Sequence, residues 1–189
     1  MGKAIQMDVK SLASIQERTE IIEEWKGRGL SFHDFDSIRE EMLSDDSEKQ
    51  RWFGVVDKNN GMIIAIFDVR CVPLESPQYH KSMRIHFAPG LNPEDWDDSS
   101  GQSLDNIENI ITKTVSAMSF AFRHLVEEAE QTDERLVKIY CEHPLRLLMF
   151  QEFARNLVKA VPDAYEVCFY KSWVEIRHIQ GGRHGSCGV

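Results

Sequence analysis

The sequence predicts a mixed α/β fold (α+β in its early part), in which one sheet carries helices on both faces. Three observations lead to this prediction. The first strand patterns are joined by a short turn, whereas the later ones alternate with helical patterns. The segment 62–67 is apolar on both faces, as in a central strand that is covered on both sides. Apolar residues make up 42% of the 189 residues, which is enough for a core.

The first part of the chain predicts a strand and two helices. Residues 3–7 are expected to form a short strand. Apolar residues then recur at helical spacing over 12–25, and Gly27 predicts the end of this helix. Ser31 and Asp34 form a capping pair for a second helix. The apolar face of that helix would consist of Phe35, Ile38 and Met42.

A β-hairpin is the clearest local signal. Segments 52–57 and 62–69 are rich in strand-forming residues, and Asn60-Gly61 lies between them. Asn-Gly favours the positive φ angles of a tight turn, so we expect positive φ at both residues. The sequence therefore predicts an antiparallel pair of strands around this turn.

A further strand and a long helix follow. Residues 81–87 alternate between apolar and polar side chains, with Arg84 and His86 on the polar face. Ser103 is expected to cap a helix that runs to residue 131. Its apolar residues alternate at spacings of three and four, which predicts one buried face. This stripe is Leu104, Ile107, Ile111, Val115, Met118, Phe122, Leu125 and Ala129.

The last part of the chain predicts strand, helix, strand. The strands are expected at 136–141 and 165–170, with a helix at 143–153 between them. We expect a single domain over 1–180, because no interior linker is visible, and a Gly-rich tail over 181–189.

Composition bounds the partners and the compartment. The formal net charge is −9, and acidic residues interrupt every basic stretch, so nucleic-acid binding is disfavoured. No apolar run is long enough to span a membrane, and no signal peptide is visible. Cys71, Cys141 and Cys168 lie in or beside apolar strand patterns, where free cysteine acts as a small hydrophobe. We therefore expect a reduced, cytoplasmic protein.

The order of elements resembles that of the GCN5-related N-acetyltransferase (GNAT) family along nearly the whole chain. In that family the fourth strand leads into the long third helix, and segments 81–87 and 103–131 take these places here. The resemblance implies an acyl-CoA site at the start of the long helix, in a loop of pattern Q/R-x-x-G-x-G/A. If acetyl-CoA binds, its pyrophosphate would meet the backbone amides of Ser100, Gly101, Gln102 and Ser103.

Two departures from the family pattern bear on activity. The segment before Gly101 carries the carboxylates of Glu94, Asp95, Asp97 and Asp98, which oppose a bound pyrophosphate and favour a solvated acidic loop. The family's last helix carries N-x-x-A-x-x-x-Y, whose tyrosine hydroxyl can protonate the leaving thiolate. The matching frame in this sequence is His143, Arg146 and Phe150. Because phenylalanine has no hydroxyl, it cannot act as a general acid.

Other candidate chemistry is sparse, and we expect neither a catalytic residue nor a metal site. His33 and Asp36 look like a metal pair, but capping and surface polarity explain them, since structural metal sites need three or four ligands. His178, His184 and Cys187 are assigned to the Gly-rich end of the chain, where we expect mobility instead of a metal. Arg84 and His86 could orient a substrate, although a polar strand face toward solvent also explains them.

Two functions remain from the sequence. The first is a GNAT-fold protein with a degenerate acyl-CoA site that binds a protein partner, or copies of itself, without catalysis and without a cofactor. The closing segment is loosely similar to the small GNAT-like internal virion proteins of short-tailed bacteriophages, which implies a virion component if the chain is phage-encoded. The alternative is an N-acyltransferase that uses acetyl-CoA through a divergent loop.

Overall fold

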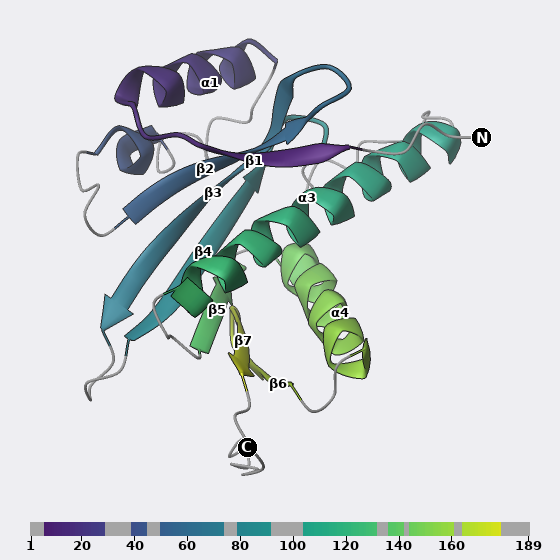
Figure 1. Cartoon of the computed structure of the whole chain (residues 1–189). Coiled ribbons are helices and arrows are strands. Elements are labelled where there is room, and N and C mark those ends of the chain that lie inside the picture. The colour runs from purple at the N-terminus through teal and green to yellow at the C-terminus, as the bar shows by residue number, and fades with distance from the viewer. Residues whose placement is uncertain are drawn as a thin grey trace. The chain divides into compact units, whose positions relative to one another are not determined.

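A computed structural model describes residues 6–28, 39–44, 50–73, 79–91, 104–131, 136–141, 144–160 and 164–178. Seven strands form one mixed sheet in the order β1-β2-β3-β4-β5-β7-β6 (Figure 1). The predicted fold class, a mixed α/β sheet accompanied by helices, is confirmed. The chain divides into two compact units. The first comprises Met1–Arg70 and Ile85–His124, and the second comprises Cys71–Arg84 and Leu125–Val189. The expectation of one domain over 1–180 stays a prediction.

The first unit is built on an antiparallel meander. The bounds of its strands are β1 Met7–Ser11, β2 Gln50–Asp57 and β3 Met62–Pro73. β1 pairs with β2, and β2 pairs with β3. Consecutive residues of β3 from Ile64 to Val69 are all buried, so both faces of this strand are covered. The prediction of a doubly covered central strand is therefore confirmed. The first strand was expected at 3–7; residues 3–5 lie outside the described residues, and β1 runs on from Met7 to Ser11.

The hairpin between β2 and β3 is confirmed, although its turn differs from the expected one. The backbone N–H groups of Asn60 and Gly61 both donate to the carbonyl of Asp57, at 3.2 and 2.8 Å. Gly61 has φ +73°. Asn60 does not have a positive φ: among the non-glycine residues of the described ranges, only Lys171 has one. The expectation of positive φ at both residues is wrong. A four-residue loop needs the left-handed conformation only at its last position.

Helix α1 (Ile15–Gly27) begins later than the apolar spacing indicates. Ser14 is its N-cap, and its Oγ accepts a hydrogen bond from the N–H of Glu17 at 3.1 Å. Leu12 precedes the helix yet is fully buried. Ile21, Ile22 and Trp25 form the buried face of α1. The second predicted helix falls mostly outside the described residues. Within them, residues 39–43 are helical, and Met42 is fully buried as expected.

Helix α3 (Leu104–Gln131) confirms the predicted long helix but not its whole buried face. Four residues of the predicted stripe are buried: Met118, Phe122, Leu125 and Ala129. Ile111 and Val115 are 41% and 42% exposed, so the prediction is wrong for them. The buried face in this part of the helix passes through Thr114 and Ala117 instead. The sequence pattern favoured the larger apolar side chains, whereas the smaller side chains beside them face the core. The size of a side chain alone does not show which side of a helix is buried.

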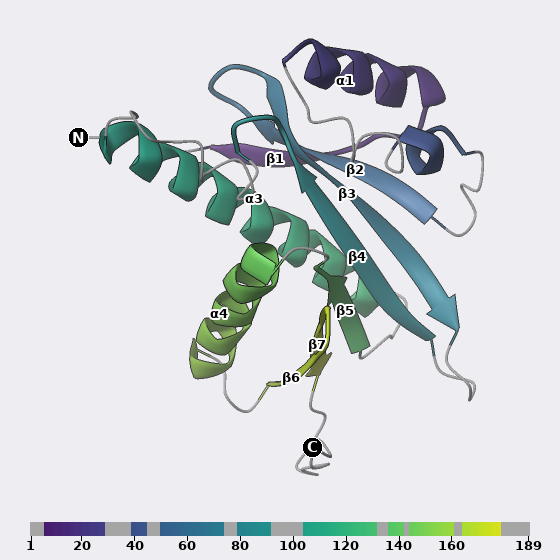
Figure 2. The ribbon, with the colours of Figure 1, turned by 180° about the vertical axis from the view of Figure 1, so that it is seen from behind.

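The second unit contains the closing part of the sheet. Its elements are β5 Leu136–Tyr140, α4 Pro144–Ala160, β6 Tyr165–Tyr170 and β7 Trp173–His178. β5 pairs antiparallel with β7, which in turn pairs antiparallel with β6. Helix α4 packs against β6 and β7 (Figures 1 and 2). The predicted strand, helix and strand are confirmed. Helix α4, however, continues well past residue 153, where its predicted range ended.

Strand β7 was not predicted. Lys171 and Ser172 form the two-residue turn between β6 and β7, and Lys171 has φ 51°. Two-residue hairpins favour asparagine, aspartate and glycine, so a Lys-Ser turn gives almost no signal. Val174 and Ile176 show the apolar alternation of a strand, and both are buried.

Replacing Gly61 with valine is expected to lower the free energy of unfolding by about 1 kcal/mol or more. The added Cβ would meet no atom within 4 Å, so the cost comes from the positive φ alone. Gly27→Ala is the matched control, because this site is equally open and has no positive φ. Urea denaturation measures both variants. Unchanged stability of Gly61→Val would contradict the turn geometry.

Replacing Phe122 with alanine is expected to cost about 3–5 kcal/mol, as truncation of buried phenylalanine does. Its side chain is 5% exposed. Val115→Ala lies on the same helix, and its effect should stay within about 0.5 kcal/mol because Val115 is exposed. Equal losses in the two variants, measured by thermal and chemical denaturation, would show that the face of α3 is wrongly assigned.

Candidate functional site

The residues predicted to meet an acyl-CoA pyrophosphate lie outside the described part of the chain. These are Ser100, Gly101, Gln102 and Ser103, and the acidic residues 94–98 precede them. The described chain resumes at Leu104, the first residue of α3, and Asp105 lies in the first helical turn. A carboxylate at this end complements the helix dipole and competes with an incoming phosphate for it.

Phe150 is the residue in the frame of the family's tyrosine, and the structure places it in the core. It lies in the middle of α4 with 1% of its side chain exposed, and Ala154, one turn later, is fully buried. His143, at the start of the same frame, is outside the described residues. An aromatic ring without a hydroxyl can neither donate nor accept a proton here.

The parallel pairing of β4 (Tyr79–Phe87) with β5 is short. The ladder joins 81–84 to 137–140 and ends at the pair Arg84 and Tyr140. β5 itself ends there, and the N–H of Cys141 donates to the carbonyl of Ser172 at 2.8 Å. The backbone after β5 therefore turns toward the loop before β7.

The cysteines differ in their environments. Cys141 is a buried free thiol, as predicted, and burial raises its pKa to about 12, so it stays protonated and unreactive at neutral pH. Cys71 is also free, but it is exposed, so the expectation of a buried role is wrong. Cys168 is disulfide-bonded, which corrects the expectation of a free thiol. Cys168 lies half-buried on β6. The sequence did not reveal its disulfide, because spacing along the chain does not show which side chains meet in space.

Polar side chains of β4 extend beyond the two that the sequence singled out. The alternation is confirmed: Met83 and Ile85 are buried, whereas Arg84 and His86 are half-buried. Sequence reasoning missed His80, Lys81 and Ser82 at the start of the strand, all of which are buried. Each charged or imidazole side chain of these β4 residues takes part in an interaction. Their interactions favour a structural role on this strand over a free acid or base.

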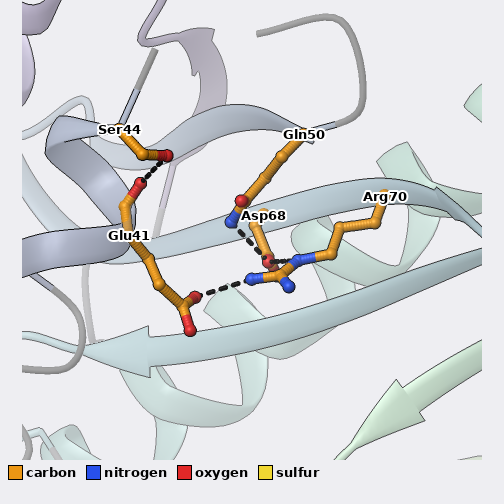
Figure 3. A network of polar contacts seen from close by, with 5 residues as sticks. All are labelled: Glu41, Ser44, Gln50, Asp68 and Arg70. Atoms are coloured by element: carbon orange, nitrogen blue, oxygen red, sulfur yellow. Dashed lines mark hydrogen bonds and ion pairs between the residues drawn. The ribbon is translucent and has the colours of Figure 1, made fainter. Parts of the chain in front are cut away.

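A polar network joins β2, β3 and the helical residues 39–43 in the first unit (Figure 3). Its centre is the carboxylate of Asp68, which is 1% exposed although it lies within the apolar strand β3. Arg70 Nε donates to Asp68 Oδ2 at 2.5 Å, and Gln50 Nε2 donates to the same oxygen at 2.9 Å. Arg70 Nη2 contacts Glu41 Oε2 at 2.6 Å.

The network of Asp68, Arg70, Gln50 and Glu41 forms a clamp that joins the helical residues 39–43 to the sheet. A buried carboxylate is tolerated when it is paired and hydrogen-bonded, and Arg70 and Gln50 meet that need for Asp68. The guanidinium is shared between Asp68 and Glu41, so it holds the helical residues against the sheet. Sequence reasoning missed this network. The available signal was Asp68 and Arg70, two charged residues of opposite sign in a mostly apolar strand.

The described ranges offer neither a metal-binding cluster nor a membrane-spanning helix. They contain no group of three or more His, Cys, Asp or Glu side chains that could hold a metal ion. The pair His33 and Asp36 lies outside these ranges, as do His184 and Cys187. His178 is the last residue of β7 and pairs with Tyr165, so its expected place in a mobile tail is wrong. None of the described helices is both long and apolar enough to cross a membrane.

The solved structures that resemble this chain share little sequence with it. No family model and no curated protein matches the chain. Among solved structures, it is similar to glucosamine-6-phosphate N-acetyltransferase from Arabidopsis thaliana (13% identity, 96% of this chain and 99% of that one, TM-score 0.44). It is also similar to mutant forms of a spermidine/spermine N-acetyltransferase from Vibrio cholerae (13%, 92% and 94%, TM-score 0.45) and to a putative acetyl transferase from Pyrococcus furiosus (9%, 79% and 91%, TM-score 0.45). Likeness at these TM-scores carries no conclusion about the substrate or the activity of this chain.

Loss of the Arg70 guanidinium tests the clamp. Arg70→Met is expected to cost about 3 kcal/mol, because Asp68 would remain buried with one partner fewer. This is the low end for a broken buried pair, since the Arg70 side chain is itself 32% exposed. Adding Asp68→Asn should recover part of the loss by removing the uncompensated charge.

Arg28→Met is the matched control, because Arg28 forms an exposed pair with Glu24 at 3.5 Å and should cost less than about 1 kcal/mol. Chemical denaturation of all variants gives the comparison. If Arg70→Met is as mild as Arg28→Met, the network does not stabilise the fold.

Proposed function

We propose that this chain is a GNAT-fold protein that binds a protein partner and does not transfer acyl groups. One observation carries the proposal. Phe150 stands in the frame of the family's tyrosine, and its ring is buried at 1% exposure. The general acid that the family resemblance implies for the leaving thiolate is therefore absent at this position.

The Cys141 thiol does not replace that acid. It follows β5 directly, but burial raises its pKa to about 12, far from the pKa of an effective proton donor at neutral pH. Tyr140 precedes it and carries a hydroxyl, and its ring lies 5.0 Å from that of Trp173. The buried thiol supports a binding role over a catalytic one.

The acidic residues 94–98 support the same proposal from the sequence. A bound pyrophosphate needs converging amide donors and a positive field. This segment supplies four carboxylates and leaves a single glycine, Gly101, before α3. A role inside a virion is part of the same hypothesis and rests only on the loose sequence resemblance.

A second candidate function is an N-acyltransferase that uses acetyl-CoA. The observation in its favour is the short ladder between β4 and β5, which ends at Arg84 and Tyr140. In the GNAT resemblance, the fourth and fifth strands open beyond such a point. This candidate would require that Ser100 to Ser103 supply the amide donors and that protonation of the thiolate proceed without the tyrosine.

Isothermal titration calorimetry with acetyl-CoA separates the two functions. We expect no binding tighter than about 1 mM, which is only about −4 kcal/mol. Raising the salt concentration should not rescue binding, because screening weakens repulsion but creates no donors. A micromolar dissociation constant would favour the acyltransferase.

Phe150→Tyr serves as the companion variant. It restores the hydroxyl, but we expect no release of free coenzyme A from acetyl-CoA with polyamine or peptide acceptors, because the cofactor itself does not bind. The variant should also lose about 1–3 kcal/mol of stability through a buried hydroxyl, unless that hydroxyl finds a partner. Turnover by either form would refute the non-catalytic assignment.

A further inference from the structure

The first half of helix α3 carries an exposed row of apolar side chains. Ile111 and Val115 are 41% and 42% exposed, and Ile107, one turn earlier, is half-buried. Residues four positions apart lie on the same side of a helix, so these three side chains form one row along α3. A single exposed apolar side chain is common on protein surfaces, whereas a contiguous row of them is typical of a contact surface.

The hydroxyl groups beside this exposed row are satisfied within the helix. Thr112 Oγ1 donates to the carbonyl of Glu108 at 2.6 Å, and Ser119 Oγ donates to the carbonyl of Val115 at 2.9 Å. Covering these hydroxyls would therefore leave no donor without an acceptor, which is the usual cost of burying a polar group. Another helix can thus cover the exposed row and the residues beside it.

Charges of opposite sign lie at the two ends of the exposed row. Asp105 and Glu108 are exposed at its first end, and Arg123 is exposed beyond its other end. The only charged residue between Glu108 and Arg123 is Lys113, which pairs with Asp57 at 3.1 Å. The middle of the exposed row is therefore uncharged.

This distribution of charge favours a second copy of the same chain as the occupant. A two-fold axis brings a surface against itself, so a charge near the axis would meet its own like, whereas an uncharged centre is compatible with the axis. Two copies of α3 that pack antiparallel would place the acidic end of one helix beside the basic end of the other. Opposite charges attract in that arrangement, whereas a parallel arrangement would bring like charges together.

An axis beside Val115 fits both the side-chain sizes and the charges. In an antiparallel pair, residues equally far before and after the axis face each other. Ile111 and Ser119 lie four positions before and after Val115, and the small serine lets the helices approach closely. Glu108 lies seven positions before Val115, and Arg123 lies eight positions after it. Arg123 already takes part in an interaction within the chain, but a guanidinium has five N–H donors and can bind a further carboxylate.

We propose that the chain forms a two-fold dimer by antiparallel packing of α3, with Val115 at the axis and Glu108 of each copy beside Arg123 of the other. This inference rests on the proposed function, because it names a second copy as the partner of a binding protein. Since the exposed row is short, the dimer should be reversible, with a dissociation constant on the order of 10 μM. Protein diluted well below this concentration is monomeric.

Sedimentation equilibrium of the full chain tests the dimer between about 1 μM and about 500 μM, because association depends on concentration. We expect a single monomer–dimer equilibrium. Val115→Glu places two carboxylates at the axis and should weaken the dimer by about a hundredfold. Ile15→Glu is the matched control, because Ile15 is 43% exposed at the start of α1, and it should leave the dimer unchanged.

Charge reversal tests the antiparallel arrangement. Glu108→Arg and Arg123→Glu should each weaken the dimer by about tenfold, because each variant brings like charges together at both ends of the contact. The double variant should associate as the unchanged protein does, since the exchange restores both pairs. A purely structural role of either residue would not give this recovery. Circular dichroism checks that each variant is folded, and the measurement on the unchanged protein needs no variant.

Several results would overturn the proposal. These are a monomer at the highest concentration, a dimer that Val115→Glu leaves intact, and a double variant that does not recover association. The acetyl-CoA titration tests the proposed function separately. Cofactor binding by an intact dimer would refute only the proposed function, and a monomer that does not bind the cofactor would refute only this surface.

Discussion

The carboxylate of Asp57 is the interaction on which the first unit most depends. Its Oδ1 accepts hydrogen bonds from the backbone and side-chain nitrogens of Asn59, both at 3.0 Å, which shapes the hairpin turn. Its Oδ2 meets Lys113 of α3 at 3.1 Å, and its backbone pairs with Met7 of β1. Burial alone would raise the pKa of this carboxyl, but the bonds from Asn59 and Lys113 hold it below its usual range. Through its side chain and its backbone, this one residue thus joins the turn, the long helix and the first strand.

Sequence patterns were informative where one local signal decides the structure. Asn60-Gly61 and the two apolar segments beside it were sufficient for the hairpin, since only Gly61 must adopt a positive φ. Strand β7 was missed because its turn is made by Lys171 and Ser172, which carry no turn signature. The face of α3 was partly misjudged because Ile111 and Val115 are large and apolar, yet the helix turns Thr114 and Ala117 toward the core. Burial is decided by packing partners that the local sequence does not contain.

The candidate site, too, was only partly predictable from the sequence. The replacement of a tyrosine by Phe150 is visible in the sequence, and the structure adds that its ring is buried. The clamp of Asp68, Arg70 and Glu41 was not predictable, because Arg70 and Glu41 are 29 positions apart and only the fold brings them together.

The proposed function requires that this chain does not bind acyl-CoA. A residue-resolved NMR titration with coenzyme A tests it most directly, because the amides of the first turn of α3 report on any phosphate bound at that helix end. The account predicts that the amide signals of Asp105 and Asn106 do not shift at millimolar coenzyme A, and that those of α4 around Phe150 do not shift either. Saturating shifts at Asp105 and Asn106 at micromolar coenzyme A would contradict it.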